Sequence, residues 1–192
     1  MQWGLVPIAY LLGTFPSAVI VARSKGIDIT TAGSGNPGAS NVARVMGGRW
    51  GVLVFALDGL KGAIPALVGS AVDEPKLAYV LVAAAMLGHM YPVTRRFHGG
   101  KGVATLGGAM VVLHLLVFAV LLAVWMSVRK FTGKASLGSL VIAVGLPVGV
   151  AIAGSPGWEV GAVAALCVLV LLRHADNIRR LLGGSELSAS QG

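Results

Sequence analysis

The sequence has 192 residues, of which 56% are hydrophobic and only 11% charged, and its mean hydropathy is +0.84. Soluble domains carry about a quarter charged residues, so this composition excludes an ordinary water-soluble domain and indicates segments that cross a bilayer. The formal charge is +8, but the basic residues stand at the ends of apolar runs. We therefore expect membrane lipid as a partner and no nucleic acid.

Apolar runs long enough for membrane helices occur along most of the chain. The first covers residues 3–22, about 30 Å of helix, and has no basic residue ahead of it. We interpret it as a membrane span, kinked by Pro7 and Pro16, rather than as a cleavable signal peptide. A simple count gives six spans, because further runs cover residues 50–71, 76–92, 103–128, 136–153 and 158–172.

The distribution of charge argues for a seventh crossing. Basic clusters follow the first, third, fourth and last runs, whereas Asp73, Glu74 and Glu159 flank the others. Basic loops stay on the cytoplasmic side, and all these clusters can do so only if the chain crosses twice between Lys101 and Arg129. We predict an all-α polytopic membrane helix bundle of seven transmembrane helices, with the N-terminus outside and the C-terminus cytoplasmic.

The run over residues 103–128 decides between six and seven crossings. Its 26 residues are too many for one upright span and rather few for two. We expect two short helices that turn near His114, and the alternative is one tilted span. One membrane domain is expected over residues 1–182, followed over residues 183–192 by a short cytoplasmic tail to which no role is assigned.

The first polar motif covers residues 33–44 and reads Gly-Ser-Gly-Asn-Pro-Gly-Ala-Ser-Asn-Val-Ala-Arg. Its glycines expose backbone N–H groups, and a helix that starts near Ala39 would direct the positive end of its dipole at the loop. Such loops bind phosphate. Ser34 and Asn36 add donors, and Arg44 can bind an oxyanion through its planar guanidinium group. The alternative is a flexible glycine-rich connector.

The second motif joins residues 88–93, Gly-His-Met-Tyr-Pro-Val, to residues 97–105, Phe-His-Gly-Gly-Lys-Gly-Val-Ala-Thr. The Gly-Gly-Lys-Gly core precedes a predicted helix, which favours an anion-binding turn around Lys101. It lacks the glycine spacing and the Lys-Ser/Thr pair of a Walker A motif. A tight turn without a ligand is the alternative.

The third motif covers residues 173–181, Arg-His-Ala-Asp-Asn-Ile-Arg-Arg-Leu, after the last apolar run. Helical spacing places His174 and Asn177 on one face, where they can contact a ligand, whereas for Arg179 and Arg180 we favour binding of lipid headgroups. No His and carboxylate cluster has the spacing of metal ligands, so no metal is expected.

Asp58 and Lys61 lie one helical turn apart inside the second apolar run. Ionisable groups inside a membrane are candidates for a functional site. An i,i+3 pair can also neutralise itself, and we favour a structural ion pair here.

Together these segments resemble the PlsY family of bacterial membrane acyltransferases. All three motifs match that family in order, and the stretch from Leu57 to Gly62 is also similar, so the resemblance covers nearly the whole chain before Gly183. It implies an enzyme without a cofactor that transfers an acyl group from acyl phosphate to the 1-hydroxyl of sn-glycerol 3-phosphate. The products would be 1-acyl-sn-glycerol 3-phosphate and phosphate, in the committed step of phospholipid synthesis.

The resemblance also implies which residues form the site, and it implies a protein of the bacterial inner membrane whose site faces the cytoplasm. We expect a monomer, although the sequence leaves the oligomeric state open. One departure is Gly138, which stands where the family commonly has alanine. The implied catalytic residues are Ser34, Arg44, Lys101, His174 and Asn177, and the implied substrate-binding residues are Gly35, Asn36, Gly38, Asn41, Gly99, Gly100, Gly102 and Ser139.

The sequence leaves open which group is the general base of the reaction, and it leaves open a second class of function. No histidine has an aspartate five residues on, so the His-x4-Asp pattern of other glycerolipid acyltransferases is absent. Either His174 or a substrate phosphate oxygen accepts the proton, and we favour the phosphate. The alternative function is a small membrane transporter or lipid carrier for anionic substrates. Transporters usually bind near the membrane midplane between repeated halves, and we find no repeat.

Overall fold

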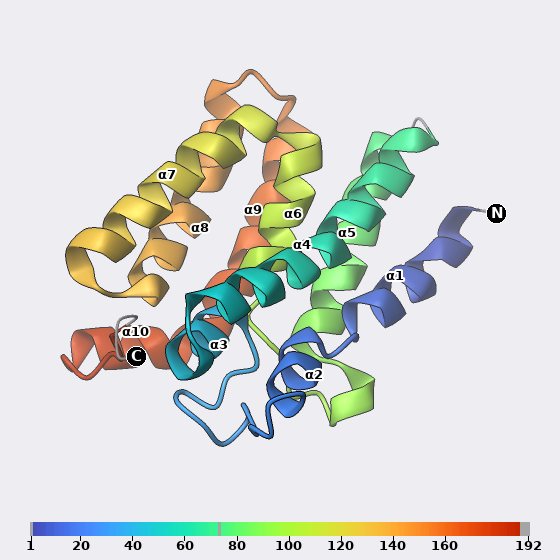
Figure 1. Ribbon diagram of the computed structural model, residues 1–192. Helices are drawn as coiled ribbons and strands as arrows, with labels where there is room; N and C mark the ends of the chain where they lie inside the picture. The colour runs from blue at the N-terminus through green and yellow to red at the C-terminus, as the bar shows by residue number, and fades with distance from the viewer. Residues whose placement is uncertain (1, 73, 189–192) are drawn as a thin grey trace. The chain divides into compact units, whose positions relative to one another are not determined.

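The computed structural model describes residues 2–72 and 74–188 (Figure 1). These residues form ten α-helices and two 3-10 helices, with no strand among them, so the all-α prediction is confirmed. They divide into two compact units, unit 1 over residues 2–112 and unit 2 over residues 113–188. The acidic residue Asp73 and tail residues 189–192 lie outside the described part of the chain.

Unit 1 contains the first two motifs. Its elements are η1 Gln2–Gly4, α1 Leu5–Gly13, α2 Ser17–Arg23, α3 Ala39–Met46, α4 Gly48–Ala71, α5 Pro75–Met90, η2 Val93–Arg95 and α6 Val103–Leu113. Helix α5 packs against both α1 and α4, and the short α3 packs on α4.

Small residues let the backbones of α1 and α5 approach closely. A Cβ at Gly13 of α1 would clash with the carbonyl group of Ala85, and a Cβ at Gly88 of α5 would clash with the carbonyl group of Tyr10. Helices in lipid gain little from burying apolar side chains against each other, so close van der Waals contact at small residues takes over that role. These contacts anchor the end of α5 that carries His89.

We expect Gly13→Ala to destabilise the protein, because its methyl group would meet backbone atoms, which cannot rotate away. Overpacking of this kind costs about 1–3 kcal/mol. The matched change is Gly161→Ala, where no atom lies within 4 Å of the new Cβ, and alanine is better than glycine in a helix by about 1 kcal/mol. Thermal unfolding in detergent should show a lower Tm for the first variant only, and equal Tm values would contradict this packing.

The first apolar run is kinked where Pro16 was expected to kink it. Helix α1 ends at Gly13 and α2 begins at Ser17. The break leaves the carbonyl group of Phe15 outside a regular helix, where it accepts a hydrogen bond from the N–H of Ser17 at 3.0 Å. It also accepts one from the Lys61 ammonium group, so the kink creates an acceptor inside the bundle.

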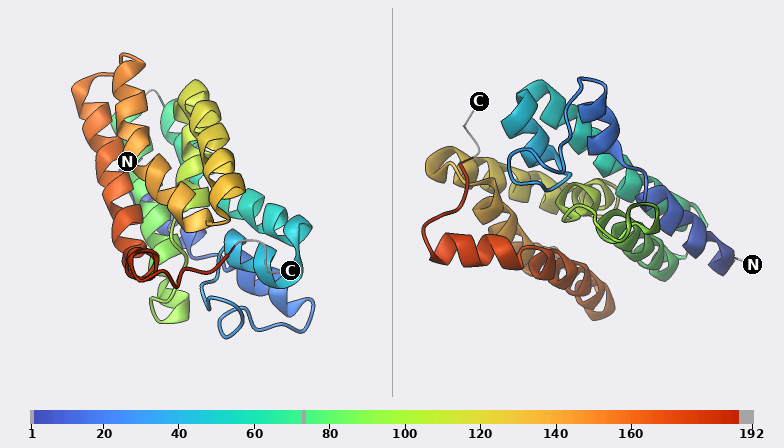
Figure 2. Two further views of the ribbon diagram at one scale, coloured as in Figure 1. Left: turned by 90° about the vertical axis from the view of Figure 1, so that its left-hand side faces the viewer. Right: turned by 90° about the horizontal axis from the view of Figure 1, so that it is seen from below.

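Unit 2 consists of α7 Leu115–Thr132, α8 Ala135–Ile152, α9 Gly157–Arg173 and α10 Ala175–Leu182. Helix α8 packs against both α7 and α9 (Figure 2). Helix α7 buries none of its residues, and Leu116 and Phe131 are 81% and 83% exposed. Such an apolar surface is typical of a helix that faces lipid.

Five helices are long and apolar enough to cross a membrane. The pair of α9 and α10, which is bent by 59°, makes a sixth span if the two helices count as one. The stretch over residues 103–128 is broken at His114 (φ −145°, ψ 61°), so the expected division into two helices with a turn at His114 is confirmed. Helix α6 has 11 residues, about 17 Å, shorter than a bilayer core of about 30 Å. Seven crossings therefore stay a prediction.

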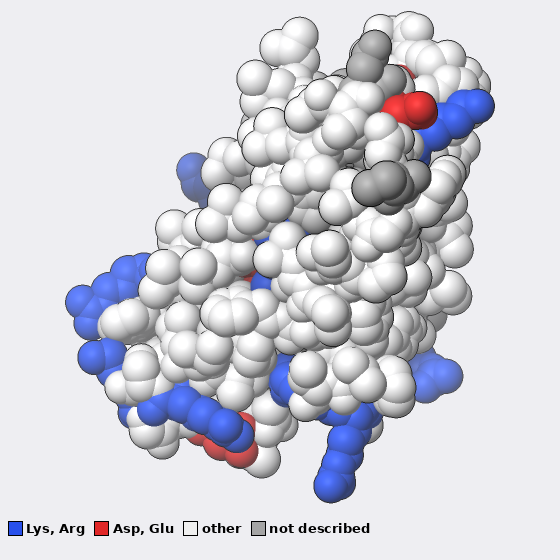
Figure 3. All heavy atoms as spheres, turned by 90° about the vertical axis from the view of Figure 1, so that its right-hand side faces the viewer, with Lys and Arg blue, Asp and Glu red and all other residues white. Residues whose placement is uncertain are grey.

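The surface agrees with a membrane environment. Figure 3 shows a face on which most atoms belong to uncharged residues, with Lys and Arg side chains standing out singly or in small groups. Lys25 and Arg49 both lie over the ring of Trp50, at 5.1 and 5.3 Å from its centroid. Aromatic and basic side chains together are typical of the membrane–water interface.

Candidate active site

The buried side chain of Asn41 organises the loop of the first motif. Its Nδ2 donates to the carbonyl groups of Ile29 and Ala32 at 3.3 and 2.9 Å. Its Oδ1 accepts the backbone N–H of Ser34 at 2.8 Å and Nη1 of Arg44 at 3.2 Å. The structure therefore gives Asn41, which we expect to contact substrate, a further role in holding the loop.

Glycine is required at two positions of this loop. Gly33 and Gly35 have φ values of +60° and +69°, in the left-handed region that only glycine adopts readily. A Cβ at Gly33 would also clash with Oδ1 of Asn41. Helix α3 begins at Ala39, where the sequence predicted a start. A loop fixed by these contacts is not a flexible connector.

The second motif packs directly against the end of α5. The N–H of Gly100 donates to the carbonyl group of His89 at 3.1 Å. A Cβ at Gly99 would clash with that same carbonyl group, and a Cβ at Gly100 would clash with the His89 imidazole ring. Gly102 has a φ of +79°, and α6 starts at the next residue. Lys101 is thus held in a short segment fixed at both ends, next to the positive end of a helix dipole.

A cavity within unit 1 brings the first two motifs together. Pro37 of the first motif and Gly100 of the second both line it. The free space of about 10 Å³ accommodates about one water molecule. Asp58, Lys61 and His89 line the same cavity, so charged groups from the interior of α4 and α5 reach the place where the two motifs meet.

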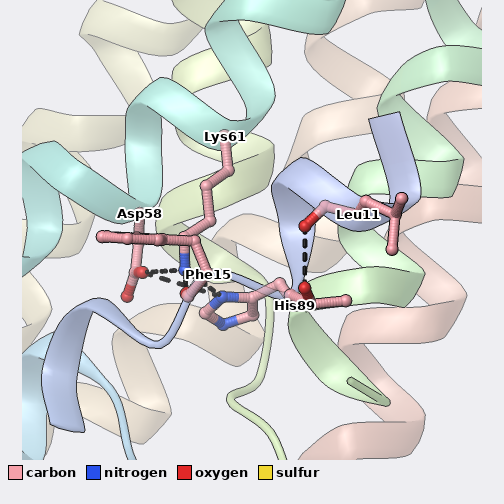
Figure 4. Close-up of polar contacts among 6 residues, drawn as sticks. Leu11, Phe15, Asp58, Lys61 and His89 are labelled. Atoms are coloured by element: carbon pink, nitrogen blue, oxygen red, sulfur yellow. Dashed lines mark hydrogen bonds and ion pairs between the residues drawn. The ribbon is translucent and has the colours of Figure 1, made fainter. Parts of the chain in front are cut away.

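The predicted ion pair of Asp58 and Lys61 is confirmed (Figure 4). Lys61 Nζ lies 2.7 Å from Asp58 Oδ1, and both side chains are buried. The third member of this group, His89, was not predicted from the sequence; its Nδ1 lies 3.4 Å from Lys61 Nζ and 3.7 Å from Asp58 Oδ1. The only hint in the sequence that His89 belongs to this group was its position beside Gly88 at the end of an apolar run. We call Asp58, Lys61 and His89 the Lys61 cluster.

In unit 2, the third motif lies where α9 bends into α10. His174 joins the two helices and is 2% exposed, and Asn177 is 4% exposed. The His174 ring is hydrogen bonded through Nδ1 to the carbonyl group of Val170 at 2.8 Å. Because a carbonyl group only accepts, Nδ1 carries the proton, and Nε2 of the neutral ring is an acceptor.

Glu186, in the segment after α10, gives a structural contact to the tail, whose role the sequence left open. Its Oε1 accepts hydrogen bonds from Ser136 Oγ at 2.7 Å and from Asn177 Nδ2 at 2.6 Å. Its Oε2 lies 2.9 Å from Nε of Arg180. The sequence hinted at this contact only through a single carboxylate that follows shortly after two arginines. Glu186 ties the tail to α8 and to the third motif.

Trp125 of α7 contacts both Ser139 and Gly138, and this explains why glycine replaces the alanine common in the family at position 138. Ser139 Oγ donates to the carbonyl group of Ala135 at 3.0 Å and accepts Nε1 of Trp125 at 3.2 Å. A Cβ at Gly138 would lie 2.8 Å from Cδ1 of the same ring, so glycine leaves room for the indole. The expected contact of Ser139 with substrate stays a prediction.

We expect Glu186→Gln to lower the Tm at pH 7. Burial raises the pKa of Glu186, but the hydrogen bonds from Ser136, Asn177 and Arg180 outweigh it, so the pKa lies below its usual value. A carboxyl group with a depressed folded-state pKa stabilises the fold above its unfolded pKa, and this contribution is lost as the pH falls through the folded pKa.

The deficit in Tm of Glu186→Gln should therefore shrink below a pH of about 4. The control is Asp176→Asn, because Asp176 pairs with Arg179 on the surface, where ion pairs contribute little. Thermal unfolding in detergent at pH 7 and at low pH measures both variants. A deficit of equal size at the two pH values would contradict the role given to this carboxylate.

The fold and the site define a class of protein: an integral membrane protein of apolar helices that carries glycine-rich and cationic motifs suited to anionic substrates. The family model described as "Glycerol-3-phosphate acyltransferase" matches residues 3–184. The chain belongs to this glycerol-3-phosphate acyltransferase family.

Two relatives illustrate the match. The glycerol-3-phosphate acyltransferase of Aquifex aeolicus (strain VF5) is 40% identical over 185 residues, which cover 95% of this chain and 96% of that protein. The glycerol-3-phosphate acyltransferase of Ralstonia pickettii (strain 12J) is also 40% identical over 185 residues, covering 93% of this chain and 89% of that protein. The relatives therefore match almost end to end.

Solved structures show the same fold. The chain is 38% identical to PlsY (YgiH), described as an integral membrane glycerol 3-phosphate acyltransferase, and matches its glycerol 3-phosphate form with a TM-score of 0.93 over 97% of this chain and 94% of that chain. The lysophosphatidic acid form of PlsY matches with a TM-score of 0.91. The resemblance predicted from the three motifs is confirmed.

Proposed function

We propose that this protein transfers an acyl group from acyl phosphate to the 1-hydroxyl of sn-glycerol 3-phosphate and releases 1-acyl-sn-glycerol 3-phosphate and phosphate. Membership of the glycerol-3-phosphate acyltransferase family supports the acceptor and the reaction. The observation that carries the proposal is that the two glycine-rich motifs meet at one cavity of unit 1, which Pro37 of the first motif and Gly100 of the second both line. Glycine-rich turns with a cation suit phosphate groups.

The chemistry needs positioning more than a reactive side chain. Acyl phosphate is an activated mixed anhydride, so the 1-hydroxyl oxygen attacks the acyl carbon, the bond from that carbon to the phosphate oxygen breaks, and phosphate leaves. The hydroxyl proton passes to a base. Fixed donors and cations hold two anions together and stabilise the developing charge. Arg44 and Lys101 have this role in our proposal, and no cofactor takes part.

We assign the remaining site residues on the motif matches and on their local structure. Ser34 lies in the loop held by Asn41, and His174 and Asn177 are buried at the bend between α9 and α10. The substrate-binding residues of the proposal are Gly35, Asn36, Gly38, Asn41, Gly99, Gly100, Gly102 and Ser139.

The base is either Nε2 of His174 or a phosphate oxygen of the substrate, and we favour the phosphate. The hydrogen bond from Nδ1 to Val170 leaves Nε2 of the neutral ring as an acceptor, which supports the histidine alternative. We expect His174→Gln to keep measurable turnover. Removing a general base costs about 10²–10⁴-fold, so a loss of that size in kcat, with an unchanged Tm, would favour His174 instead.

A purified sample in detergent separates the enzyme from the alternative transporter. With acyl phosphate and labelled glycerol 3-phosphate, the enzyme forms lysophosphatidate without any sealed compartment, whereas transport requires one. Acyl-CoA in place of acyl phosphate tests the donor and should give no product. Uptake into vesicles without product formation in detergent would refute the proposal.

We propose seven crossings and a single domain over residues 1–182, working as a monomer in the bacterial inner membrane with the site at the cytoplasmic face. The positions of the basic clusters support this orientation. Single cysteines at exposed Ser24, Lys130 and Ser185, in a Cys167→Ser background, should react with an impermeant reagent from the cytoplasmic side, and a cysteine at Glu74 from the other side. Labelling of Ser24 and Ser185 from opposite sides would refute it.

A further inference from the structure

The Lys61 ammonium group has acceptors for all three of its N–H donors. These are Oδ1 of Asp58 at 2.7 Å, the carbonyl oxygen of Phe15 at 2.5 Å and Nδ1 of His89 at 3.4 Å (Figure 4). The ammonium group is a donor only, so Nδ1 of His89 is its acceptor. The proton of the neutral imidazole ring is then on Nε2.

Nε2 is also the atom of the His89 ring that faces Gly100 most closely. A Cβ built on Gly100 would clash first with Nε2 of His89. The main chain of His89 contacts the same segment, since its carbonyl group accepts the N–H of Gly100 at 3.1 Å. The imidazole ring and the backbone of His89 therefore both support the turn at Gly100. Lys101 is the residue that follows Gly100.

The free energy of burying these charged groups favours a role for them beyond stabilising the fold. Removing two charges from water costs several kcal/mol per ion, and apolar side chains of similar volume often replace buried ion pairs without loss of stability. The Lys61 ammonium group binds the Asp58 carboxylate, the His89 imidazole and the carbonyl group of Phe15. These directional contacts fix one orientation of the His89 ring, which an apolar contact would not.

We propose that Asp58, Lys61 and His89 are positioning residues for the phosphate-binding turn, and that they act on glycerol 3-phosphate through Gly100 and Lys101. The inference rests on the proposed function, in which Lys101 binds the substrate phosphate. None of the three residues takes part in the acyl transfer itself.

The test compares three variants of the full-length protein in detergent. Lys61→Met leaves Asp58 without its cation, so both Tm and activity should fall. The double variant Asp58→Asn with Lys61→Met removes both charges and should recover most of the Tm. The control is Leu77→Ala, a buried position at the other end of α5, about 18 Å from His89 along the helix.

The KM for glycerol 3-phosphate, with saturating acyl phosphate, decides between positioning and stability alone. We expect it to rise about tenfold in the double variant even with the Tm recovered, and to stay within about twofold in Leu77→Ala, where only the Tm falls. A KM of the double variant within twofold of the wild type would overturn the proposal.

A second pair of variants tests the same contact without touching the buried charges. Gly100→Ala places a methyl group against the His89 ring and should raise the same KM, and His89→Ala in the same chain should relieve part of that rise. An unchanged KM in Gly100→Ala would also overturn the proposal. Failure of the proposed function is distinct, since it would show as no lysophosphatidate from the wild type or as normal turnover in Lys101→Ala.

Discussion

Lys101→Ala and Arg44→Ala are each expected to lower turnover by at least about 10²-fold, the loss typical when one preorganised charge-stabilising group is removed. Lys101 lies in the segment clamped between the His89 contact and the start of α6, and Arg44 is held by Oδ1 of Asn41. The guanidinium group of Arg44 and the backbone of Lys101 are therefore held in place before substrate binds. The measurement is lysophosphatidate formation by purified protein in detergent.

The controls remove a cation of the same kind elsewhere in unit 1. Lys76→Ala removes an exposed lysine in the first turn of α5, and Arg49→Ala removes an exposed arginine over the ring of Trp50. Both should keep turnover within about twofold of the wild type, since exposed charges away from a site contribute little. Near-normal rates in Lys101→Ala and Arg44→Ala, with Tm values also near wild type, would show that these two residues do not belong to the active site.

Asn41→Leu should have the second largest effect, on both turnover and stability. The change keeps the approximate volume but removes the hydrogen bonds to the carbonyl groups of Ile29 and Ala32 and to the N–H of Ser34. A buried group that loses its partner costs about 1–3 kcal/mol. We expect a loss of that size in the free energy of unfolding, and a fall in turnover of about 10²-fold or more as Ser34 and Arg44 lose their fixed positions.

Thr31→Ala is the matched control in the same loop. The Thr31 hydroxyl donates to the carbonyl group of Asp28 at an exposed position, so its loss should change the free energy of unfolding by no more than about 0.5 kcal/mol. Unfolding in detergent and the acyl transfer assay measure both variants. Full activity in Asn41→Leu would show that the loop does not depend on this side chain.

Local patterns in the sequence predicted the elements and the chemistry of the motifs well. The start of α3 at Ala39, the start of α6 after Gly102, the kink at Pro16 and the helix break at His114 all match. The first three depend on glycine, proline or apolar periodicity within a few residues, which act on the backbone directly. The break at His114 follows from the distribution of basic residues along the chain. The ion pair of Asp58 and Lys61 matches because both lie on one helix face.

The roles of Asn41, His89 and Glu186 depended on contacts between distant segments. Asn41 binds a carbonyl group twelve residues back, His89 meets Lys61 from another helix, and Glu186 reaches Ser136 fifty residues away. No periodicity or motif spacing encodes such partners, because they follow from how helices pack once close approach at small residues is satisfied. The sequence by itself determined that this is a helical membrane protein with three polar motifs. Only the tertiary structure decided which buried side chains hold those motifs in place.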